Sequence, residues 1–360
     1  MEVPCHAQIM SAKPFQLTII IPTKDRREIL SHLLDSVKQL SAIDRIVPEI
    51  IVADNNSQDD TYEYLTVTAR SFPTTIRLLR VLRGGKSAAI NDAVRISTGN
   101  VLAFLDDDVV VDKMWLTSVE AFFNTGAYHA AQGTVRLQPT AGEDSEVQRL
   151  NQRYRTIPMI EHESSLKEVR SLNGSNFFVR RDAFDRIGGF DERLGPGASG
   201  TSEDLEFAHR LACWGITIGV APNAVVYHHV DRNRLTDEYF IQRHWHQGRS
   251  RLLIRDRSHV QICFNLVRAN AQYVYYTLIG KERKRYRSKG RVYHYLGMFD
   301  AKRKQFRSLE GDVGWNRSMP KVQAQQENPR AKLYPMIEKK GPHLAQTSVP
   351  QQSGDVSGRH

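Results

Sequence analysis

Cysteine is scarce in this chain of 360 residues: Cys5, Cys213 and Cys263 are the three present, and they lie far apart in the sequence. So few cysteines exclude a disulfide framework and a cysteine-based zinc site, and they favour a reducing, cytoplasmic compartment. No uninterrupted apolar run of about 18 residues occurs, and the N-terminus has no basic region followed by a long apolar run. We therefore expect a protein that is neither exported by a signal peptide nor membrane-spanning.

Two glycine-rich phosphate-binding patterns are also missing. No G-x-G-x-x-G follows the first apolar run, and no G-x-x-x-x-G-K-[ST] occurs. Their absence argues against a dinucleotide-dependent dehydrogenase and against a P-loop enzyme. The remaining composition, with 40% hydrophobic and 25% charged residues, supplies enough apolar material for a full globular core.

Positive charge is concentrated near the C-terminus. The chain has a net charge of +10, but residues 232–340 contain 25 Lys and Arg against 9 Asp and Glu, a local charge of +16, which leaves −6 for the rest. The densest block is KERKRYRSKGR, Lys281 to Arg291. Such a segment could be a solvated helical face, could contact an anionic membrane surface, or could bind nucleic acid.

Apolar runs alternate with helical patterns in the first third of the chain. Expected strands are Leu17 to Ile21, Glu49 to Ala53, Thr75 to Leu82 and Val101 to Leu105, and expected helices are 29–40, Asp59 to Arg70 and Lys86 to Ile96. Strands alternating with helices predict an α/β fold in which a mostly parallel central sheet has helices on both faces.

Polar residues follow each of these four strands. They are Pro22, Thr23, Lys24 and Asp25 after the first, Asp54 and Asn55 after the second, Arg83 to Lys86 after the third, and Asp106, Asp107 and Asp108 after the fourth. In open α/β sheets, ligands bind outside the carboxyl ends of the strands. We therefore expect one polar crevice there.

The remaining chain predicts three further regions. After about residue 125 the pattern is mixed, with a strand at Tyr128 to Leu137, a polar helix near Glu143 to Arg155 and a strand pair leading to VVYHHV. From Tyr239 the chain is expected to be helical, and beyond about Gly311 it lacks the apolar residues that offset ordering entropy. The expected division is a disordered N-terminus over 1–16, a domain over 17–231 with halves 17–125 and 126–231, a basic helical extension over 232–310, and a disordered tail over 311–360.

Three consecutive carboxylates, Asp106 to Asp108, are unfavourable at the end of an apolar strand without a counter-charge. A divalent cation with hard oxygen ligands, Mg²⁺ or Mn²⁺, would supply it and would be shared with substrate phosphates. The alternative is an Asp-rich turn that caps the helix starting near Lys113. An ordinary Asx turn is likewise the alternative explanation of Asp54 to Ser57.

A second acidic pair, Glu203 and Asp204, opens a predicted helix directly after the loop GPGASG, which contains Gly197 and Gly200. Acidic residues in a first helical turn can simply be favoured by the helix dipole. The glycines, however, predict a mobile cover, and a carboxylate beneath such a cover is suited to act as a general base.

Histidines close a later strand in the sequence VVYHH. His228 is either a structural residue or a neutral imidazole that completes a carboxylate and phosphate site for Mn²⁺. His244 and His246 are a weaker candidate pair, because residues i and i+2 of a helix point to different sides.

The order of these motifs resembles the family 2 glycosyltransferases, the inverting nucleotide-sugar transferases of GT-A fold. The segments that carry the resemblance are IIIPTKDR, IVADNNSQDD, RGGKSAAINDAV, VLAFLDDDV, NGSNFFVRR, GGFDERLGPG, SEDLEFAHRL and VYHH, between Leu17 and Val230. The resemblance implies a hexosyltransferase-type enzyme in which 17–125 is the nucleotide-binding half and 126–231 the acceptor half. The Gly-rich loop is longer than in the shortest family members, and the Arg-rich stretch after Tyr239 matches no particular subfamily.

The resemblance also implies roles in binding the nucleotide-diphosphate sugar donor. Pro22, Thr23 and Asp25 would line the nucleotide, Asp54 would accept a hydrogen bond from the base, Lys86 would lie near the ribose or phosphates, and Asp106 and Asp107 would orient ribose and diphosphate.

For the chemistry, the resemblance implies that Asp108 binds the divalent cation, with His228 as a second ligand. Asp204 would be the catalytic base of a single displacement, and Glu203 would hold the acceptor or the helix start, with Gly197 and Gly200 in the lid. The acceptor would be a glycan or a lipid-linked molecule in cell-surface polysaccharide or glycolipid synthesis, in the cytoplasm or at the inner face of an anionic membrane.

Two other functions are kept as alternatives. A sugar-phosphate nucleotidyltransferase shares the layered sheet and metal carboxylates, but it needs a basic Gly-rich loop after the first strand, which IIPTKDRRE lacks. A non-enzymatic nucleic-acid-binding protein would use the basic C-terminal third. Binding that weakens steeply with salt and is indifferent to Mn²⁺ would distinguish this function from the transferase. Nucleic acid is the less favoured partner.

Overall fold

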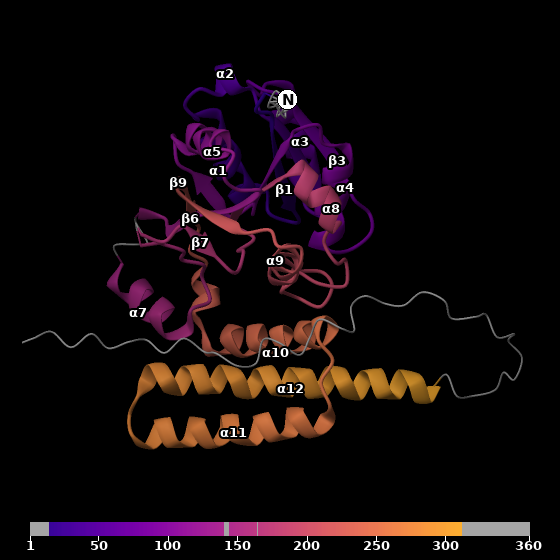
Figure 1. Cartoon of the computed structure of the whole chain (residues 1–360), viewed down its shortest axis with the longest axis vertical. Coiled ribbons are helices and arrows are strands. Elements are labelled where there is room, and N and C mark those ends of the chain that lie inside the picture. The colour runs from indigo at the N-terminus through magenta and orange to yellow at the C-terminus, as the bar shows by residue number, and fades with distance from the viewer. Residues whose placement is uncertain (1–13, 140–143, 164, 312–360) are drawn as a thin grey trace, which may run out of the picture. The chain divides into compact units, whose positions relative to one another are not determined.

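The computed structural model describes residues 14–139, 144–163 and 165–311 (Figure 1). The predicted disordered segments therefore lie almost wholly outside the described residues. Residues 14–16, which we assigned to the N-terminal segment, are held at the edge of the domain. The backbone N–H of Gln16 donates to Asn100 Oδ1 at 3.0 Å, and Asn100 Nδ2 donates to the carbonyl of Pro14 at 2.7 Å.

The first half confirms the predicted alternation of strands and helices. Its elements are β1 (Leu17–Thr23), α1 (Arg27–Lys38), α2 (Ile43–Ile46), β2 (Glu49–Asp54), α3 (Thr61–Arg70), β3 (Ile76–Arg80), α4 (Lys86–Ile96) and β4 (Val101–Leu105). Strand β1 pairs in parallel with both β2 and β4, and β2 pairs in parallel with β3. The carboxyl ends of these strands consequently meet at one edge of the sheet.

The second half completes a mixed sheet. It contains β5 (Val109–Val111), α5 (Trp115–Asn124), β6 (Ala130–Leu137), α7 (Ser145–Tyr154), β7 (Glu168–Val169), β8 (Asn176–Arg180), α8 (Arg181–Ile187), α9 (Glu203–Cys213) and β9 (Ile218–His228). The strand order is β3-β2-β1-β4-β8-β6-β9-β5, with β7 against β9. Because β8 runs antiparallel to both β4 and β6, the sheet is parallel only in its first half and between β6 and β9.

The predicted strand pair before VVYHH is instead one strand, β9, and this part of the prediction was wrong. Its pairing with β6 shifts between Gly133 and Thr134, which face Ala221 and Val225. The extra residues begin at Pro222, and proline has no backbone N–H to donate to the ladder. The strand therefore bulges there and continues in the same direction, where a turn between two strands was expected.

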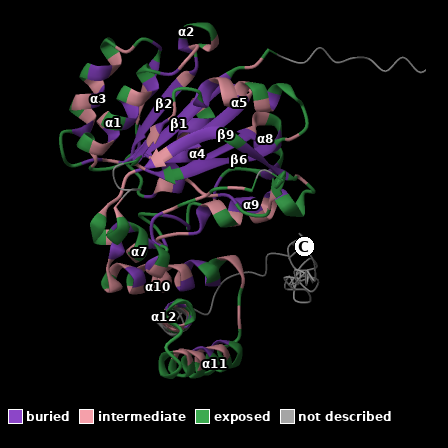
Figure 2. Cartoon of the chain, turned by 90° about the vertical axis from the view of Figure 1, so that its left-hand side faces the viewer, coloured by how far each residue is buried: buried purple, intermediate pink, exposed green. Residues whose placement is uncertain are grey.

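Helices cover both faces of the sheet (Figures 1 and 2). Alternate residues of β1 point to opposite sides: Ile19 packs in one core with Leu30 of α1 and Trp115 of α5, and Ile20 packs in the other with Ile90 of α4. Helices α8 and α9 join the second core. Every residue of β1 is buried, as the unalternating run LTIII predicts.

Between β9 and residue 311, where the described chain ends, there are four helical segments: η1 (Arg232–Leu235), α10 (Asp237–Ile254), α11 (His259–Leu278) and α12 (Glu282–Gly311). Both views place α12 between α10 and α11, and Leu252, Ile262 and Met298 form an apolar cluster among these three helices (Figures 1 and 2). In the part of the chain that the structure describes, no helix has the length and apolar character needed to cross a membrane.

We expect the contact between α10 and α12 to depend on two glycines. A Cβ on Gly248 would lie 1.9 Å from the carbonyl oxygen of His294, and one on Gly297 would lie 2.1 Å from that of Trp245. Gly248→Ala and Gly297→Ala should each lower the free energy of unfolding by about 1–3 kcal/mol, although the helix propensity of alanine alone would raise it by about 1 kcal/mol.

Thermal or denaturant unfolding checks this prediction, with Gly126→Asn as the control. A Cβ at Gly126 has nothing within 4 Å, and asparagine tolerates its φ of +70°. Stability that is unchanged or increased in both alanine variants would contradict the close packing of α10 on α12.

Candidate active site

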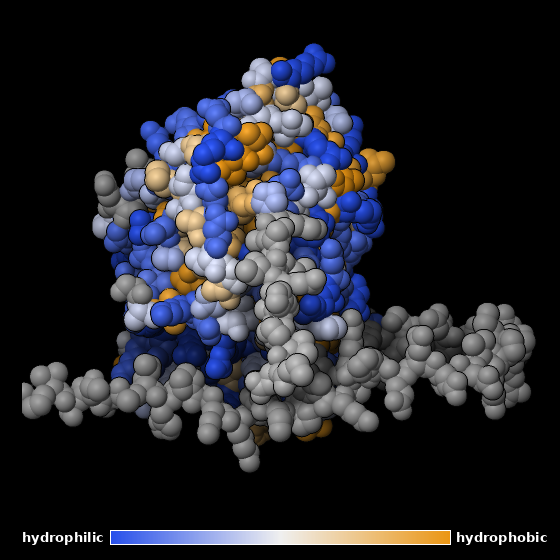
Figure 3. Space-filling model, turned by 45° about the horizontal axis from the view of Figure 1, so that its top comes forward, coloured by the Kyte–Doolittle hydropathy of each residue, from blue (hydrophilic) through white to orange (hydrophobic). Residues whose placement is uncertain are grey.

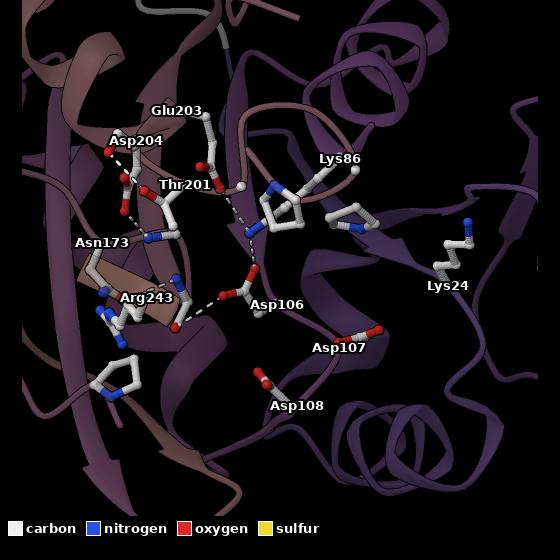
Figure 4. A pocket seen from close by; sticks show the side chains of 18 of the residues that line it. Lys24, Lys86, Asp106, Asp107, Asp108, Asn173, Thr201, Glu203, Asp204 and Arg243 are labelled. Atoms are coloured by element: carbon white, nitrogen blue, oxygen red, sulfur yellow. Dashed lines mark hydrogen bonds and ion pairs between the residues drawn. The ribbon is translucent and has the colours of Figure 1, made fainter. Parts of the chain in front are cut away.

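A cavity of about 510 Å³ lies where the carboxyl ends of β1 and β4 face the loop before α9 and one side of α10. Carboxylates and cations from distant parts of the chain line it (Figure 4). The crevice predicted from the strand ends is therefore present as one cavity, and α10 adds a wall that the sequence did not predict.

Eleven of the thirteen predicted site residues line this cavity. They are Pro22, Thr23, Lys86, Asp106, Asp107, Asp108, Gly197, Gly200, Glu203, Asp204 and His228. Asp25 and Asp54 do not. The Asp25 carboxylate accepts from the backbone N–H of Gln58 at 2.6 Å, and that of Asp54 accepts from the backbone N–H and the hydroxyl of Ser57. Both carboxylates hold the loop after β2, so the expected contact of Asp54 with a nucleotide base stays a prediction.

The three consecutive carboxylates are neutralised by basic side chains. Asp106 pairs with Lys86 and also accepts from Ser175 Oγ at 3.1 Å. Asp107 pairs with Arg26 at 2.8 Å. Asp108 lies 3.2 Å from Arg26 and 3.0 Å from Arg234.

These cations include two functional residues that the sequence reasoning missed. Arg26 directly follows the predicted Asp25 in PTKDR, and Arg234 belongs to the basic segment that we considered for membrane or nucleic acid. Adjacency to the strand-end motif was an available signal for Arg26. Local sequence gave no signal for Arg234, which meets Asp108 across 126 positions of the chain.

The carboxylates respond differently to this environment. Burial raises the pKa of Asp107 to about 6, although Arg26 opposes the shift. For Asp108, burial acts in the same direction, but His228, Arg234 and Arg26 together hold the pKa below its usual value. Asp108 is consequently the carboxylate of this pair that keeps its charge to lower pH.

Asp108 and His228 form an arrangement that suits a divalent cation. His228 Nδ1 donates to the backbone carbonyl of His229 at 2.7 Å, which fixes the ring with Nε2 directed at Asp108. That Nε2 lies 3.3 Å from Asp108 Oδ1, a buried oxygen with no hydrogen-bond partner. This nitrogen and this oxygen face each other, so a proton on Nε2 or a divalent cation in its place could lie between them.

Within 14–139, 144–163 and 165–311, no group of three or more His, Cys, Asp or Glu side chains is placed to hold a metal ion. Asp108 and His228 would therefore supply two ligands, with others coming from phosphate oxygens and water. That division is usual for Mg²⁺ and is compatible with Mn²⁺.

Asp204 lies at the start of α9 on the other side of the cavity from Asp107 (Figure 4). Its Oδ2 accepts from the backbone N–H of Gly174 at 3.0 Å. Burial and the neighbouring charge of Glu203 raise the pKa of Asp204 to about 7. Glu203 itself lies 3.5 Å from Lys86, so the available cation is shared between Glu203 and Asp106, and Asp204 has no ion-pair partner among the described residues.

The glycine-rich loop before α9 packs against its neighbours in this structure, and its role as a mobile cover stays a prediction. The backbone N–H of Lys86 donates to the carbonyl of Pro196 at 2.9 Å, and Ser199 Oγ lies 2.7 Å from Ser250 Oγ of α10. A Cβ on Gly200, which has a φ of +108°, would meet the His246 ring at 2.8 Å. These glycines therefore allow the loop to approach its neighbours closely and to adopt a left-handed backbone conformation.

The remaining wall comes from two segments that sequence reasoning did not select. The turn before β8 contributes Asn173, Gly174 and Ser175, and α10 contributes Tyr239, Arg243 and Gln247. The α10 residues are spaced by four, so they lie on one side of the helix. The guanidinium of Arg243 donates to the carbonyl of Thr156 and points toward Asp204 and Asn173 (Figure 4).

The mixed sheet with helices on both faces is the GT-A fold. Among solved structures, a mannosyltransferase from Pyrobaculum calidifontis, determined in complex with GDP-Man and Mn²⁺, matches with a TM-score of 0.53 and 18% identity, covering 81% of this chain and 87% of that one. At this identity the likeness concerns the fold alone.

Sequence relatives identify the family. Residues 18–188 match the family described as "Glycosyl transferase family 2". A succinoglycan biosynthesis protein, ExoM of Rhizobium meliloti, is 30% identical over 69% of this chain and 78% of its own length. A β-monoglucosyldiacylglycerol synthase of a Nostoc species is 26% identical over an aligned region that covers 58% of this chain and 44% of that protein. The chain belongs to glycosyltransferase family 2 and is a transferase enzyme.

The environment of Asp204 leads to a prediction about stability. Its folded-state pKa of about 7 lies above the ordinary aspartate pKa of 3.8. The unfolded chain therefore releases this proton at lower pH, and ionised Asp204 lowers stability progressively between about pH 4 and pH 7. Asp204→Asn keeps an acceptor oxygen for Gly174 and removes the charge.

We expect the melting temperature of Asp204→Asn, relative to wild type, to rise as the pH is raised from 5 to 8. Thermal melts at both pH values measure it, and Asp44→Asn, at an exposed position, is the control. A difference in melting temperature between variant and wild type that does not change with pH would mean that ionising Asp204 does not destabilise the fold.

Proposed function

We propose that the protein moves a sugar from a nucleoside-diphosphate donor to an acceptor hydroxyl in one displacement that inverts the anomeric carbon, assisted by a divalent cation. The observation that carries this proposal is the shared cavity. It places an unpaired carboxylate of raised pKa, Asp204, opposite the facing Asp108 and His228. A base and a metal site around one space are what such a displacement needs.

The donor would bind along the strand ends. Pro22 and Thr23 line the cavity beside Lys24 and would flank the nucleotide. Lys86, Asp106 and Asp107 would orient the ribose and diphosphate, while Asp25 and Asp54 would support the base from the loop beneath. Arg26, which already lies between Asp107 and Asp108, offers a further contact for phosphate oxygens.

Asp108 and His228 would hold Mn²⁺ or Mg²⁺ through the oxygen and nitrogen that face each other. When bound, such an ion neutralises negative charge on the diphosphate leaving group. Arg234, which pairs with Asp108, keeps that carboxylate ionised and therefore ready as a ligand.

Asp204 would act as the general base. Its carboxylate takes the proton of the acceptor hydroxyl while the hydroxyl oxygen forms a bond to the anomeric carbon, and the bond from that carbon to the diphosphate oxygen breaks with its electrons. The N–H of Gly174 fixes one oxygen of the base. Glu203 is occupied by Lys86, so it is better placed to position the acceptor or the helix start than to take the proton.

We propose a glycan or a lipid-linked glycan as acceptor, in cell-surface polysaccharide or glycolipid synthesis, in the cytoplasm at the inner face of a membrane. The names of the Rhizobium and Nostoc relatives support this class of product. The local charge of +16 over 232–340 supports an anionic surface as the setting.

Asp204→Asn should separate chemistry from binding. The variant keeps the side-chain shape, so donor affinity should remain within about twofold while the rate of transfer falls by roughly 10² or more. In wild type, the rate should rise with pH to a plateau above about 7, since the base must be ionised, and this limb should disappear in the variant. A parallel loss of donor affinity and rate would make Asp204 a binding residue.

Asp108→Asn should remove the dependence of nucleotide binding on the cation. Calorimetric titration of UDP and GDP, each with and without Mn²⁺, measures this, and Asp44→Asn at an exposed position is the matched control. We expect Mn²⁺ to strengthen binding to wild type and the control by tenfold or more, a difference of about 1.4 kcal/mol, and to leave Asp108→Asn unaffected. An undiminished response to Mn²⁺ in Asp108→Asn would refute the assignment.

A further inference from the structure

Helix α11 is apolar on two opposite sides, and the described protein covers one of them. The covered side contains Ile262 and Ala269, which are buried against the neighbouring helices. The opposite side carries Val260, Phe264, Val267, Val274 and Leu278, which are all exposed. These five residues, spaced by four, three, seven and four positions, form a single stripe that we call the α11 outer face.

The exposure of this stripe is extensive. Phe264 is 66% exposed and Leu278 is 81% exposed, at positions two turns or more apart on the same side of the helix. The face of the molecule in Figure 3 has apolar side chains only in small groups among hydrophilic ones. Single exposed apolar residues are ordinary, but a continuous stripe of them marks a surface that contacts something else.

The exposed charged side chains of α11 and of the residues that follow it are mostly basic. Within α11, Arg268 is exposed and no Asp or Glu occurs. The adjoining start of α12 adds exposed Lys281, Arg283, Lys284, Arg287 and Arg291. Two contacts join this block to the covered side of α11. Lys284 lies over the ring of Tyr276, 5.5 Å from its centroid, and Arg291 donates to Gln272 at 3.1 Å.

The acidic residue in this block is already paired. Glu282 lies 2.6 Å from Arg153 of α7. The exposed charge of α11 and of the first turns of α12 is therefore strongly positive, which favours a partner that carries negative charge next to apolar material.

We propose that the α11 outer face docks on an anionic lipid bilayer, with Val260, Phe264 and Leu278 entering the boundary between headgroups and acyl chains. The basic residues of the α12 start would contact lipid phosphates. An apolar stripe with Lys and Arg nearby is the composition of a helix that lies in the membrane interface. The inference rests on the proposed function for its setting, the membrane that would carry a lipid-linked acceptor.

A second copy of this chain fits the charges less well. The spacing of the stripe is that of a coiled-coil seam, but such seams are flanked by residues of both signs that pair across the interface. Here Arg268 is the sole Lys, Arg, Asp or Glu side chain of α11, and two copies would bring their basic residues together.

The arrangement also leaves the cavity open to a nucleotide sugar from solution. Helix α12 lies between α11 and α10, and α10 lines the cavity with Tyr239, Arg243 and Gln247 (Figures 1 and 2). A bilayer against the α11 outer face would contact the side of the helical layer remote from the cavity.

Sedimentation of the full chain with lipid vesicles tests the proposal. Vesicles of phosphatidylcholine alone, or of equal parts phosphatidylcholine and phosphatidylglycerol, are used at low and high salt. We expect the protein to bind the anionic vesicles and to be released by salt. We expect Phe264→Gln/Leu278→Gln to lower the partition coefficient about tenfold or more.

The matched control is Val67→Gln/Leu82→Gln, which replaces apolar side chains that are 66% and 73% exposed and lie in the half of the chain that forms the sheet. This control should bind as wild type does, and thermal melts should show both double variants folded. Absence of binding to anionic vesicles, or equal binding by the two double variants, would overturn the proposal. So would a wild-type dimer in sedimentation velocity that Phe264→Gln/Leu278→Gln converts to a monomer without vesicle binding.

Donor turnover in vesicle-free solution is measured in parallel and separates the two levels of the account. Retained turnover with no vesicle binding would overturn the docking surface and leave the proposed transfer reaction intact. Vesicle binding without turnover of any nucleotide sugar would overturn the proposed transfer reaction and leave the docking surface intact.

Discussion

Three adjacent carboxylates at the end of a buried strand must be balanced by positive charge, and much of this molecule is arranged around that requirement. Arg26 from the start of α1, Lys86 from the start of α4 and Arg234 from η1 all reach Asp106 to Asp108. Unpaired, buried carboxylates would instead take up protons and lose their function as ligands. The counter-charges come from the C-terminal segment as well as the sheet, so that segment belongs to the site.

The distribution of these cations also separates the roles of the acidic residues. Lys86 forms ion pairs with Asp106 and Glu203, and Arg234 forms one with Asp108. Asp204, in contrast, accepts hydrogen bonds from backbone N–H groups and has no ion pair among the described residues. The result is one carboxylate held ionised and another with its pKa raised to about 7 in the same cavity. Environments that push titratable groups apart in this way distinguish a metal ligand from a base.

Local patterns predicted what depends on neighbouring residues in the sequence. The unalternating run LTIII is a strand buried on both faces, as predicted. The carboxylates after VLAFL line the cavity, because the carboxyl ends of the parallel strands meet at one edge of the sheet. Long-range contacts escaped prediction. Nothing near Arg234 or Arg243 indicates that either lines the cavity, and the glycines of 195–200 resemble a mobile cover although they permit close packing on Gly85 and His246.

The account's central claim is that this cavity breaks the bond between a sugar and a nucleoside diphosphate with the help of a divalent cation. The most direct measurement is release of nucleoside diphosphate from a panel of nucleotide sugars, with Mn²⁺ or with a chelator. The account predicts release from at least one donor that depends on Mn²⁺ or Mg²⁺ and ceases on chelation. Release at an equal rate in chelator, or release from none of the donors with either cation in the presence of glycan and lipid-linked acceptors, would contradict it.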